Sequence, residues 1–180
     1  MLEIDGRRIL TTLPEKIDPQ HTAVIVIDCQ REFVDRGRFG YNTGSIGGDK
    51  SRLPQLMTRL TEFLDQARNA KVRIVHVRAI YDRHYLTDPM YERLHRLGVG
   101  HYCQSDDPAS GYYPGMEPHA GEPEVIKHRF DAFYDTELDI ILKSWKIKTI
   151  IRSASSRTAV STRRHGTATS TATTSCSPRI

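Results

Sequence analysis

Residues 22–33 read Thr-Ala-Val-Ile-Val-Ile-Asp-Cys-Gln-Arg-Glu-Phe, and this stretch decides the fold. Within it, Ala23–Ile27 is a continuous aliphatic run rich in β-branched residues, which is typical of a strand buried on both faces of a parallel sheet. The run ends at the charge of Asp28. Because ligands of open parallel sheets bind beyond the carboxyl ends of the strands, we expect Asp28 to lie at a ligand-binding edge.

The segment after this strand predicts a helix and a second strand. From Leu53 to Ala67 the apolar residues recur every three or four positions, which predicts a helix with one apolar stripe that ends near Ala70. Residues 72–77, Val-Arg-Ile-Val-His-Val, predict the next strand. The order strand, helix, strand defines a right-handed parallel crossover, so the predicted fold class is α/β.

A long excursion leads to a second charged strand end. Residues 82–123 hold clustered Asp, His, Tyr, Gly and Pro, with one modest helix predicted near Met90–Leu97. Long connections of this kind more often carry functional residues than serve only to join two strands. Residues 124–127 predict a short strand that ends at Lys127. The Asp28 carboxylate follows five apolar residues. It must therefore be solvated in a pocket, be paired with a cation, or have a raised pKa. Lys127 is a natural cationic partner for Asp28.

The pattern of alternating elements stops near Ile151. Before it, Thr136 and Asp139 resemble a weak capping box ahead of another helix, and Lys148–Ile151 opens a further strand. From Arg152 onward about half of the residues are Ser or Thr, and the composition predicts a disordered tail. The formal net charge of +4 comes from this tail, because five arginines and no acidic residue follow Ile151.

Composition limits the class of protein. A chain of 180 residues can bury a core as one domain without disulfide or metal support. Its three cysteines (29, 103 and 176) have no C-x-x-C spacing and make an odd count, which argues against a zinc ribbon and a disulfide framework. The first residues show no signal-peptide pattern, and no run of about 18 apolar residues occurs. We expect a cytoplasmic protein that neither spans a membrane nor binds nucleic acid.

Two motifs together resemble the isochorismatase-like cysteine hydrolases, a family that includes nicotinamidases, carbamoylsarcosine amidohydrolases and ureidoacrylate hydrolases. The first motif is residues 22–33. The second is Val-Ile-Lys-His-Arg-Phe-Asp-Ala-Phe-Tyr-Asp-Thr-Glu-Leu-Asp-Ile-Ile-Leu at 125–142, and the resemblance extends over about 18–151. It implies a three-layer α/β sandwich with a parallel, Rossmann-like sheet, whose C-terminal strand-helix units are missing or altered in this chain.

The resemblance also implies a reaction and its residues. Asp28 would take the proton of a cysteine thiol, and Lys127 would hold charge between carboxylate and sulfur. The thiolate would cleave a small amide, ureido or carbamoyl C–N bond through a covalent thioester, without an organic cofactor. Phe33, Phe133 and Tyr134 match aromatic positions of the two motifs and would wall the substrate pocket, although core packing is an equal interpretation for each. Homo-oligomers are common in the family.

Each residue alone has a simpler interpretation. An acidic residue that closes a strand, such as Asp28, is most often a turn former or a helix cap, and Lys127 alone is a weaker signal still. Asp82 and His84 have the D-x-H spacing of the nicotinamidase metal site, with His95 or His101 as a third ligand. A solvated loop is the favoured interpretation of that pair, and no metal is predicted.

The nucleophile of the family is not found in this chain. The family places its cysteine after the strand that begins here at Lys148, in a stretch close to Gly-Val-x-Thr-Asn-x-Cys-Val-x-Ser-Thr-Ala-Arg-Asp. Residues 153–166 read Ser-Ala-Ser-Ser-Arg-Thr-Ala-Val-Ser-Thr-Arg-Arg-His-Gly instead. None of the present cysteines is a convincing substitute: Cys29 and Asp28 are adjacent and point to opposite faces, and Cys103 and Cys176 are expected to be buried or incidental.

A displaced reading frame is compatible with the residues found here. When each codon of the common Ser, Thr, Ala and Arg types is begun at its third base, residues 153–167 permit Gly-Val-Val-Thr-Asn-x-Cys-Val-Asp-Ser-Thr-Ala-Arg-Asp without a gap. The hypothesis is that residues 1–151 are an incomplete hydrolase domain and that 152–180 are a frameshifted Ser/Thr/Arg-rich tail. Three alternatives stay open: vinyl-ether hydrolysis of isochorismate, a catalytically inactive family member, and a binding protein that uses its basic tail.

Overall fold

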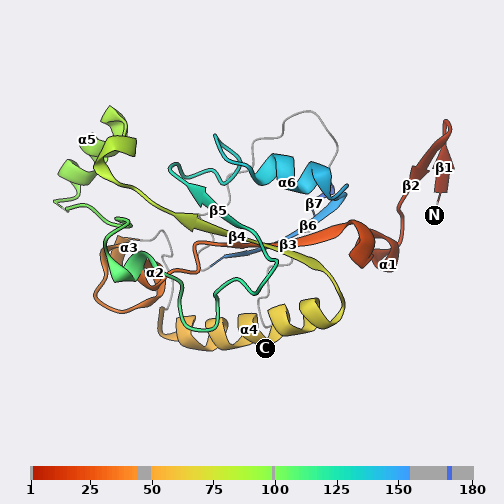
Figure 1. Cartoon of the computed structure of the whole chain (residues 1–180), viewed down its shortest axis with the longest axis horizontal. Coiled ribbons are helices and arrows are strands. Elements are labelled where there is room, and N and C mark those ends of the chain that lie inside the picture. Colours follow the sequence, from red (N-terminus) through yellow and green to blue (C-terminus); the bar gives the residue numbers. More distant parts are fainter. Residues whose placement is uncertain (1, 44–49, 99, 155–169, 172–180) are drawn as a thin grey trace.

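The computed structural model describes residues 2–43, 50–98, 100–154 and 170–171. Its middle layer is a parallel sheet in the order β5-β4-β3-β6-β7 (Figure 1). Every pairing between neighbouring strands of this sheet is parallel. The strands are β3 (Thr22–Ile27), β4 (Arg73–Ala79), β5 (Glu124–Lys127), β6 (Thr149–Ala154) and β7 (Ser170–Thr171).

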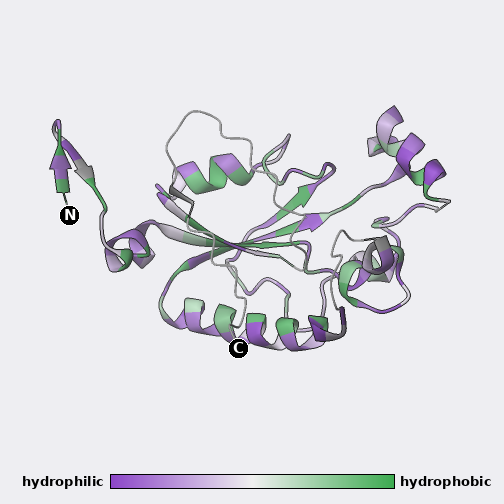
Figure 2. Cartoon of the chain, turned by 180° about the vertical axis from the view of Figure 1, so that it is seen from behind, coloured by the Kyte–Doolittle hydropathy of each residue, from purple (hydrophilic) through white to green (hydrophobic). Residues whose placement is uncertain are grey.

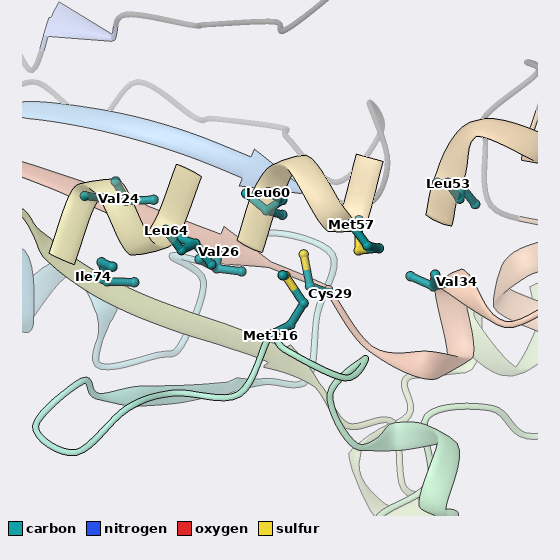
Figure 3. Close-up of a cluster of buried hydrophobic side chains, with 11 residues drawn as sticks. Val24, Val26, Cys29, Val34, Leu53, Met57, Leu60, Leu64, Ile74 and Met116 are labelled. Carbon is teal, nitrogen blue, oxygen red and sulfur yellow. The ribbon is translucent and has the colours of Figure 1, made fainter. Parts of the chain in front are cut away.

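The predicted order of strand, helix and parallel strand is confirmed. Helix α4 (Leu53–Asn69) joins β3 to the neighbouring strand β4 and lies below the sheet in Figure 1. Hydrophobic and hydrophilic residues alternate along its turns in Figure 2. Its buried side chains pack on one face of the sheet. Figure 3 shows Leu64 beside Val26 and Met57 near Cys29. The apolar stripe that the sequence predicted is therefore the contact between helix and sheet.

A second helix covers the opposite face of the sheet. Helix α6 (Leu138–Ser144) lies above the strands in Figure 1 and buries Leu138 and Leu142. These side chains share a cluster with Ile25 and Val75, which alternate along β3 and β4 with the residues that face α4. The result is a three-layer α/β sandwich with the sheet in the middle, as predicted.

The shorter elements lie before the sheet or in its loops. An antiparallel hairpin, β1 (Leu2–Ile4) and β2 (Arg7–Ile9), extends from one end of the molecule in Figure 1 and was not anticipated from the sequence. The other helical segments are α1 (Leu13–Lys16), η1 (Pro19–His21), α2 (Arg31–Val34), α3 (Phe39–Thr43), η2 (Lys50–Arg52), η3 (Arg83–Tyr85), α5 (Asp88–Arg96) and η4 (Pro108–Ser110). No helix among the described residues is long and apolar enough to cross a bilayer.

The capping prediction for α6 is wrong. Glu137 occupies the N-cap position and makes no side-chain cap hydrogen bond. The hydroxyl of Thr136 donates instead to the carbonyl oxygen of Ala132 at 2.6 Å, which ties it to the preceding turn. Thr136 and Asp139 therefore do not form a capping box, because the helix begins one residue later than the pattern implied.

Candidate active site

Asp28 lies where β3 leaves the sheet. Its backbone N–H donates to the carbonyl oxygen of Val77 on β4 at 3.0 Å, and its φ is 55°. This left-handed conformation is uncommon outside glycine, and Asp is one of the residues that tolerate it. The chain turns sharply here, so the Asp28 side chain is held at the carboxyl edge of the sheet while only 7% of the residue is exposed.

Lys127 reaches the same edge from β5. It pairs with Ala79 of β4, and its carbonyl oxygen accepts from the N–H of Ile80 at 3.0 Å. The lysine is 1% exposed. Its Nζ donates to Oδ2 of Asp28 at 2.8 Å and to the carbonyl oxygen of Phe130 at 3.2 Å. The structure thus brings together the two charged residues that the sequence placed at the ends of separate strands.

Burial dominates the electrostatics of this pair. It raises the pKa of Asp28, and the charge and hydrogen bond of Lys127 reduce that rise without cancelling it. A carboxylate with a raised pKa binds a proton more readily than an exposed aspartate does. Asp28 is therefore suited to accept a proton from a weak acid such as a thiol.

Gln30 ties this edge to the neighbouring loops and was missed by the sequence analysis. Its side chain is fully buried and its amide acts like a peptide group toward β4. Nε2 donates to the carbonyl oxygens of Ala79 at 3.0 Å and Ser110 at 2.7 Å, while Oε1 accepts from the N–H of Ala79 at 2.8 Å. Gln30 follows Asp28 by two residues and lies just beyond β3. A polar side chain at this position can make hydrogen bonds to β4 in place of the backbone of β3. This position was the available signal in the sequence.

An aromatic wall begins beside the Asp28–Lys127 pair. The ring of Tyr81 meets those of Tyr102 and Phe130 edge-on, with centroids 5.3 and 6.2 Å apart. Tyr81 is buried, and burial together with the negative charge of Asp28 raises the pKa of its hydroxyl well above the usual value. Tyr81 therefore stays protonated and neutral next to the pair. Its position two residues after the end of β4 was the available sequence signal.

Neither of the described cysteines has the surroundings of a reactive thiol. Cys29 is buried on the α4 side of the sheet, where Figure 3 shows it with Met57 and Met116. Cys103 is fully buried, and burial first and the charge of Asp28 second raise the pKa of its thiol well above the usual value. A thiol that resists ionisation is a poor nucleophile. The family's cysteine position and Cys176 lie outside the described residues.

The three predicted aromatic residues occupy different places. Phe33 packs beside the cluster that contains Tyr81 and Cys103, on the side of the candidate site. Phe133 packs against the core under α6. Tyr134 is 55% exposed. The ring of Phe33 lies 6.5 Å from that of Tyr102. The proposed part of the three residues in substrate binding stays a prediction.

Asp82 and His84 lie in the loop after β4. Oδ1 of Asp82 accepts from the backbone N–H of Ser105 at 2.7 Å, and the ring of His84 lies 4.1 Å from that of Tyr85. Within residues 2–43, 50–98, 100–154 and 170–171, no group of three or more His, Cys, Asp and Glu side chains is arranged to hold a metal ion.

Comparison with known proteins gives one consistent answer. A family model described as the isochorismatase domain matches residues 22–153. The chain is 26% identical over 159 residues to the ureidoacrylate amidohydrolase RutB of Pantoea ananatis, covering 80% of this chain and 62% of that protein. It spans about three fifths of the length of the curated relatives it matches.

Solved structures agree on the fold. A cysteine hydrolase of Pseudomonas syringae pv. phaseolicola matches with a TM-score of 0.59 at 24% identity, over 77% of this chain and 61% of that one. The N-carbamoylsarcosine amidase of Thermoplasma acidophilum matches with a TM-score of 0.56 at 22% identity, over 74% of this chain and 67% of that one. At these identities the likeness concerns the architecture alone.

Proposed function

Because this chain belongs to the isochorismatase family, we propose that it carries the proton-transfer part of a cysteine-hydrolase site for a small amide, ureido or carbamoyl C–N bond. The observation that carries the proposal is the buried pair of Asp28 Oδ2 and Lys127 Nζ, 2.8 Å apart at the carboxyl edge of the sheet. The names of the amidohydrolase and amidase relatives support the choice of bond. Homo-oligomer formation remains an expectation from the family resemblance.

The proposed mechanism gives each group one task. Asp28 takes the proton of a cysteine thiol, and the resulting thiolate attacks the substrate carbonyl carbon. The ammonium of Lys127, fixed by Asp28 and by the carbonyl oxygen of Phe130, offsets the negative charge at this edge. Protonated Asp28 then returns its proton to the leaving nitrogen as the C–N bond breaks. Water then attacks the thioester carbonyl carbon and gives a proton to Asp28; as the C–S bond breaks, Asp28 returns that proton to the cysteine sulfur.

The cysteine itself belongs to the second part of the proposal. Residues 1–151 form the incomplete hydrolase domain, and residues 152–180 are the product of a displaced reading frame. In the displaced frame the cysteine codon falls across those of Ala159 and Val160. Sequencing of the coding DNA tests this directly. The hypothesis requires a one-base change near the codon of Ile151 that restores the family motif, and it is abandoned if no such change exists.

Turnover of the frame-restored protein tests the roles of the pair. We expect hydrolysis of a small amide or carbamoyl substrate, and a loss of about 10²–10⁴-fold in kcat for Asp28→Asn and for Lys127→Ala. The exposed residues Asp106 and Lys148 provide matched controls, Asp106→Asn and Lys148→Ala, which should retain the parent rate. Unchanged turnover in both site variants would refute the assigned roles. Absence of turnover in a folded parent would refute the amidase function.

A second candidate function is vinyl-ether hydrolysis of isochorismate. It is favoured by the raised pKa of Asp28, because a protonated carboxyl group can donate to the vinyl carbon without help from a thiol. The chain as written separates the candidates. If it hydrolyses isochorismate but no amide, and Asp28→Asn abolishes that activity, the vinyl-ether function replaces the amidase proposal.

A further inference from the structure

The chain that leaves β3 changes the direction of its side chains at Asp28. Within β3, Val26 packs in the cluster that faces α4, and Ile27 packs in the cluster that faces α6. Strict alternation would continue this order and place Asp28 on the α4 face and Cys29 on the α6 face. Cys29 instead packs in the cluster that faces α4, as Figure 3 shows. The alternation is therefore broken at Asp28, the residue with the left-handed φ of 55°.

This break aims the Asp28 carboxylate at Lys127. Val125 on β5 pairs with Val77 on β4, and both side chains belong to the cluster that faces α6. Lys127 lies two positions after Val125, so its side chain stands on the α6 face as well. The contact of 2.8 Å between Lys127 Nζ and Asp28 Oδ2 therefore requires a carboxylate directed toward this face. A strand that kept its alternation would direct the carboxylate away from the ammonium.

The two charged side chains meet across an intervening strand. The sheet order β5-β4-β3 places β4 between them, so the backbones of their strands lie about 10 Å apart, which is two strand spacings. A small shift of the chain at Asp28 relative to the end of β4 is enough to separate the side chains. The contact thus depends on what holds the chain after Asp28 to that strand end.

Gln30 makes this connection. After Asp28 the main chain leaves β4, and Gln30 forms an isolated backbone bridge with Tyr112. The buried Gln30 amide returns to β4, where it donates to the carbonyl oxygen of Ala79 at 3.0 Å and accepts from the N–H of Ala79 at 2.8 Å. Ala79 in turn pairs with Lys127 on β5. One side-chain amide therefore links the exit of β3, through the end of β4, to the residue that carries the ammonium.

We propose that Gln30 is a positioning residue, whose amide bonds to Ala79 hold the irregular turn that aims the Asp28 carboxylate at Lys127. Irregular strand ends of this kind redirect side chains beside active sites. Gln30 acts through the backbone of Ala79 and takes no part in proton transfer. The positioning role concerns the geometry of the pair and requires no nucleophile, whereas its effect on turnover rests on the proposed function.

A crystal structure of the Gln30→Met variant of the full chain tests the geometry directly. Met is similar in length but cannot donate a hydrogen bond to Ala79. We expect Asp28 to leave the left-handed region and its carboxylate to lie more than about 4 Å from Lys127 Nζ, beyond the range of an ion pair. Leu142→Ala is the control for lost stability alone, because Leu142 is buried on α6, and its pair should stay at 2.8 Å. A pair that keeps its contact in Gln30→Met overturns the proposal.

The coupling between the two charged residues gives a second test in solution. Urea denaturation of Asp28→Asn, Lys127→Met and the double variant yields this coupling in the parent, Gln30→Met and Leu142→Ala backgrounds. Expressed as a ratio of unfolding constants, it should fall at least about fivefold with Gln30→Met and stay unchanged with Leu142→Ala. Equal coupling in all three backgrounds would mean that Gln30 only stabilises the fold, and the positioning role would be overturned. If Gln30→Met does not fold, Gln30→Asn replaces it, because the shorter amide stays polar but cannot reach both groups of Ala79.

Turnover of the frame-restored protein separates this inference from the proposed function. Gln30→Met should lower kcat at least about tenfold and change KM little, because a misdirected carboxylate accepts the proton less well. Leu142→Ala should retain the parent kcat. If the contact is lost in Gln30→Met while kcat is unchanged, the pair does not serve catalysis, so the proposed function fails and the positioning role stands. If the contact is kept, the positioning role fails whatever the turnover.

Discussion

Lys127 and Asp28 are two buried charges that depend on each other. Removing only the ammonium leaves a carboxylate at a site where burial already raises its pKa. We therefore predict that Lys127→Met lowers the free energy of unfolding by about 3–5 kcal/mol, the usual cost of breaking a buried ion pair. Urea denaturation measures this value. A change below about 1 kcal/mol would mean that water reaches the pair far more freely than its exposure indicates.

A double variant separates the effect of losing the charges from the effect of changing the side-chain shapes. Asp28→Asn with Lys127→Met removes both charges, so we predict that it unfolds at a higher urea concentration than Lys127→Met alone. The same urea titrations give the coupling energy between the two positions. Additive losses would contradict a direct interaction between the side chains.

The candidate site residues that stand at the ends of predicted strands could be identified from the sequence. Asp28 ends an apolar run and Lys127 ends a short predicted strand. Because the ends of parallel strands meet at one edge, the approach of the two side chains followed from the pattern. Gln30 and Phe130 could not be assigned in this way. Gln30 acts through hydrogen bonds to a strand 49 positions away, and Phe130 acts on Lys127 through its backbone oxygen, which carries no side-chain signal.

At the scale of elements, Gln30 joins the exit of β3 to the end of β4. Replacing it by Leu leaves the N–H and the carbonyl oxygen of Ala79 buried without their present partner. We predict a loss of about 2–4 kcal/mol in unfolding free energy, since each unsatisfied group costs about 1–3 kcal/mol. Hydrogen exchange at the Ala79 amide should accelerate as well. The exposed Gln20→Leu serves as control, and equal exchange at Ala79 in both variants would contradict this role.

Glu122 joins α4 to the loop before β5 and makes stability depend on pH. Burial alone would raise its pKa, but hydrogen bonds from Arg68, the His119 N–H and His76 outweigh it and lower the pKa of Glu122 to about 2. Because the folded value lies below the unfolded value, this contribution is complete above about pH 4.5 and is lost as the pH falls toward 2. Glu122→Gln should flatten the loss of stability across that window, as urea titrations at several pH values would show. An unchanged slope would contradict the prediction.

Regular elements were predictable where one interaction decided them. Helix α4 and strand β3 were predictable because both pack within the sheet core. Side chains that make such contacts follow a recognisable pattern in the sequence, an apolar stripe in α4 and an apolar run in β3. The start of α6 was not predicted correctly, because the Thr136 hydroxyl donates back to Ala132 and accepts from the N–H of Leu138 without forming a capping box. The β1–β2 hairpin has strands of only three residues, too short for a periodic pattern.

The described part of the molecule has a five-stranded parallel sheet beside the small β1–β2 hairpin, and the candidate site lies at one edge of the larger sheet. The architecture was predictable because buried parallel strands and a crossover helix leave few topologies. The family model and the shared fold support that result over residues 22–153.

The proposed reading frame determines what the residues after this segment contribute to stability. We predict that the frame-restored protein unfolds at a higher urea concentration than the chain as written, because a completed sheet buries more apolar surface. Equal midpoints would contradict this expectation.

The most direct test of the account is the apparent pKa of the cysteine in the frame-restored protein, followed by thiolate absorbance during a pH titration. If the Asp28–Lys127 pair serves a sulfur nucleophile, the thiol should ionise below the usual value of about 8.5, and Lys127→Ala should raise that pKa. A thiol pKa at or above about 8.5 that is the same with and without Lys127 would contradict the account.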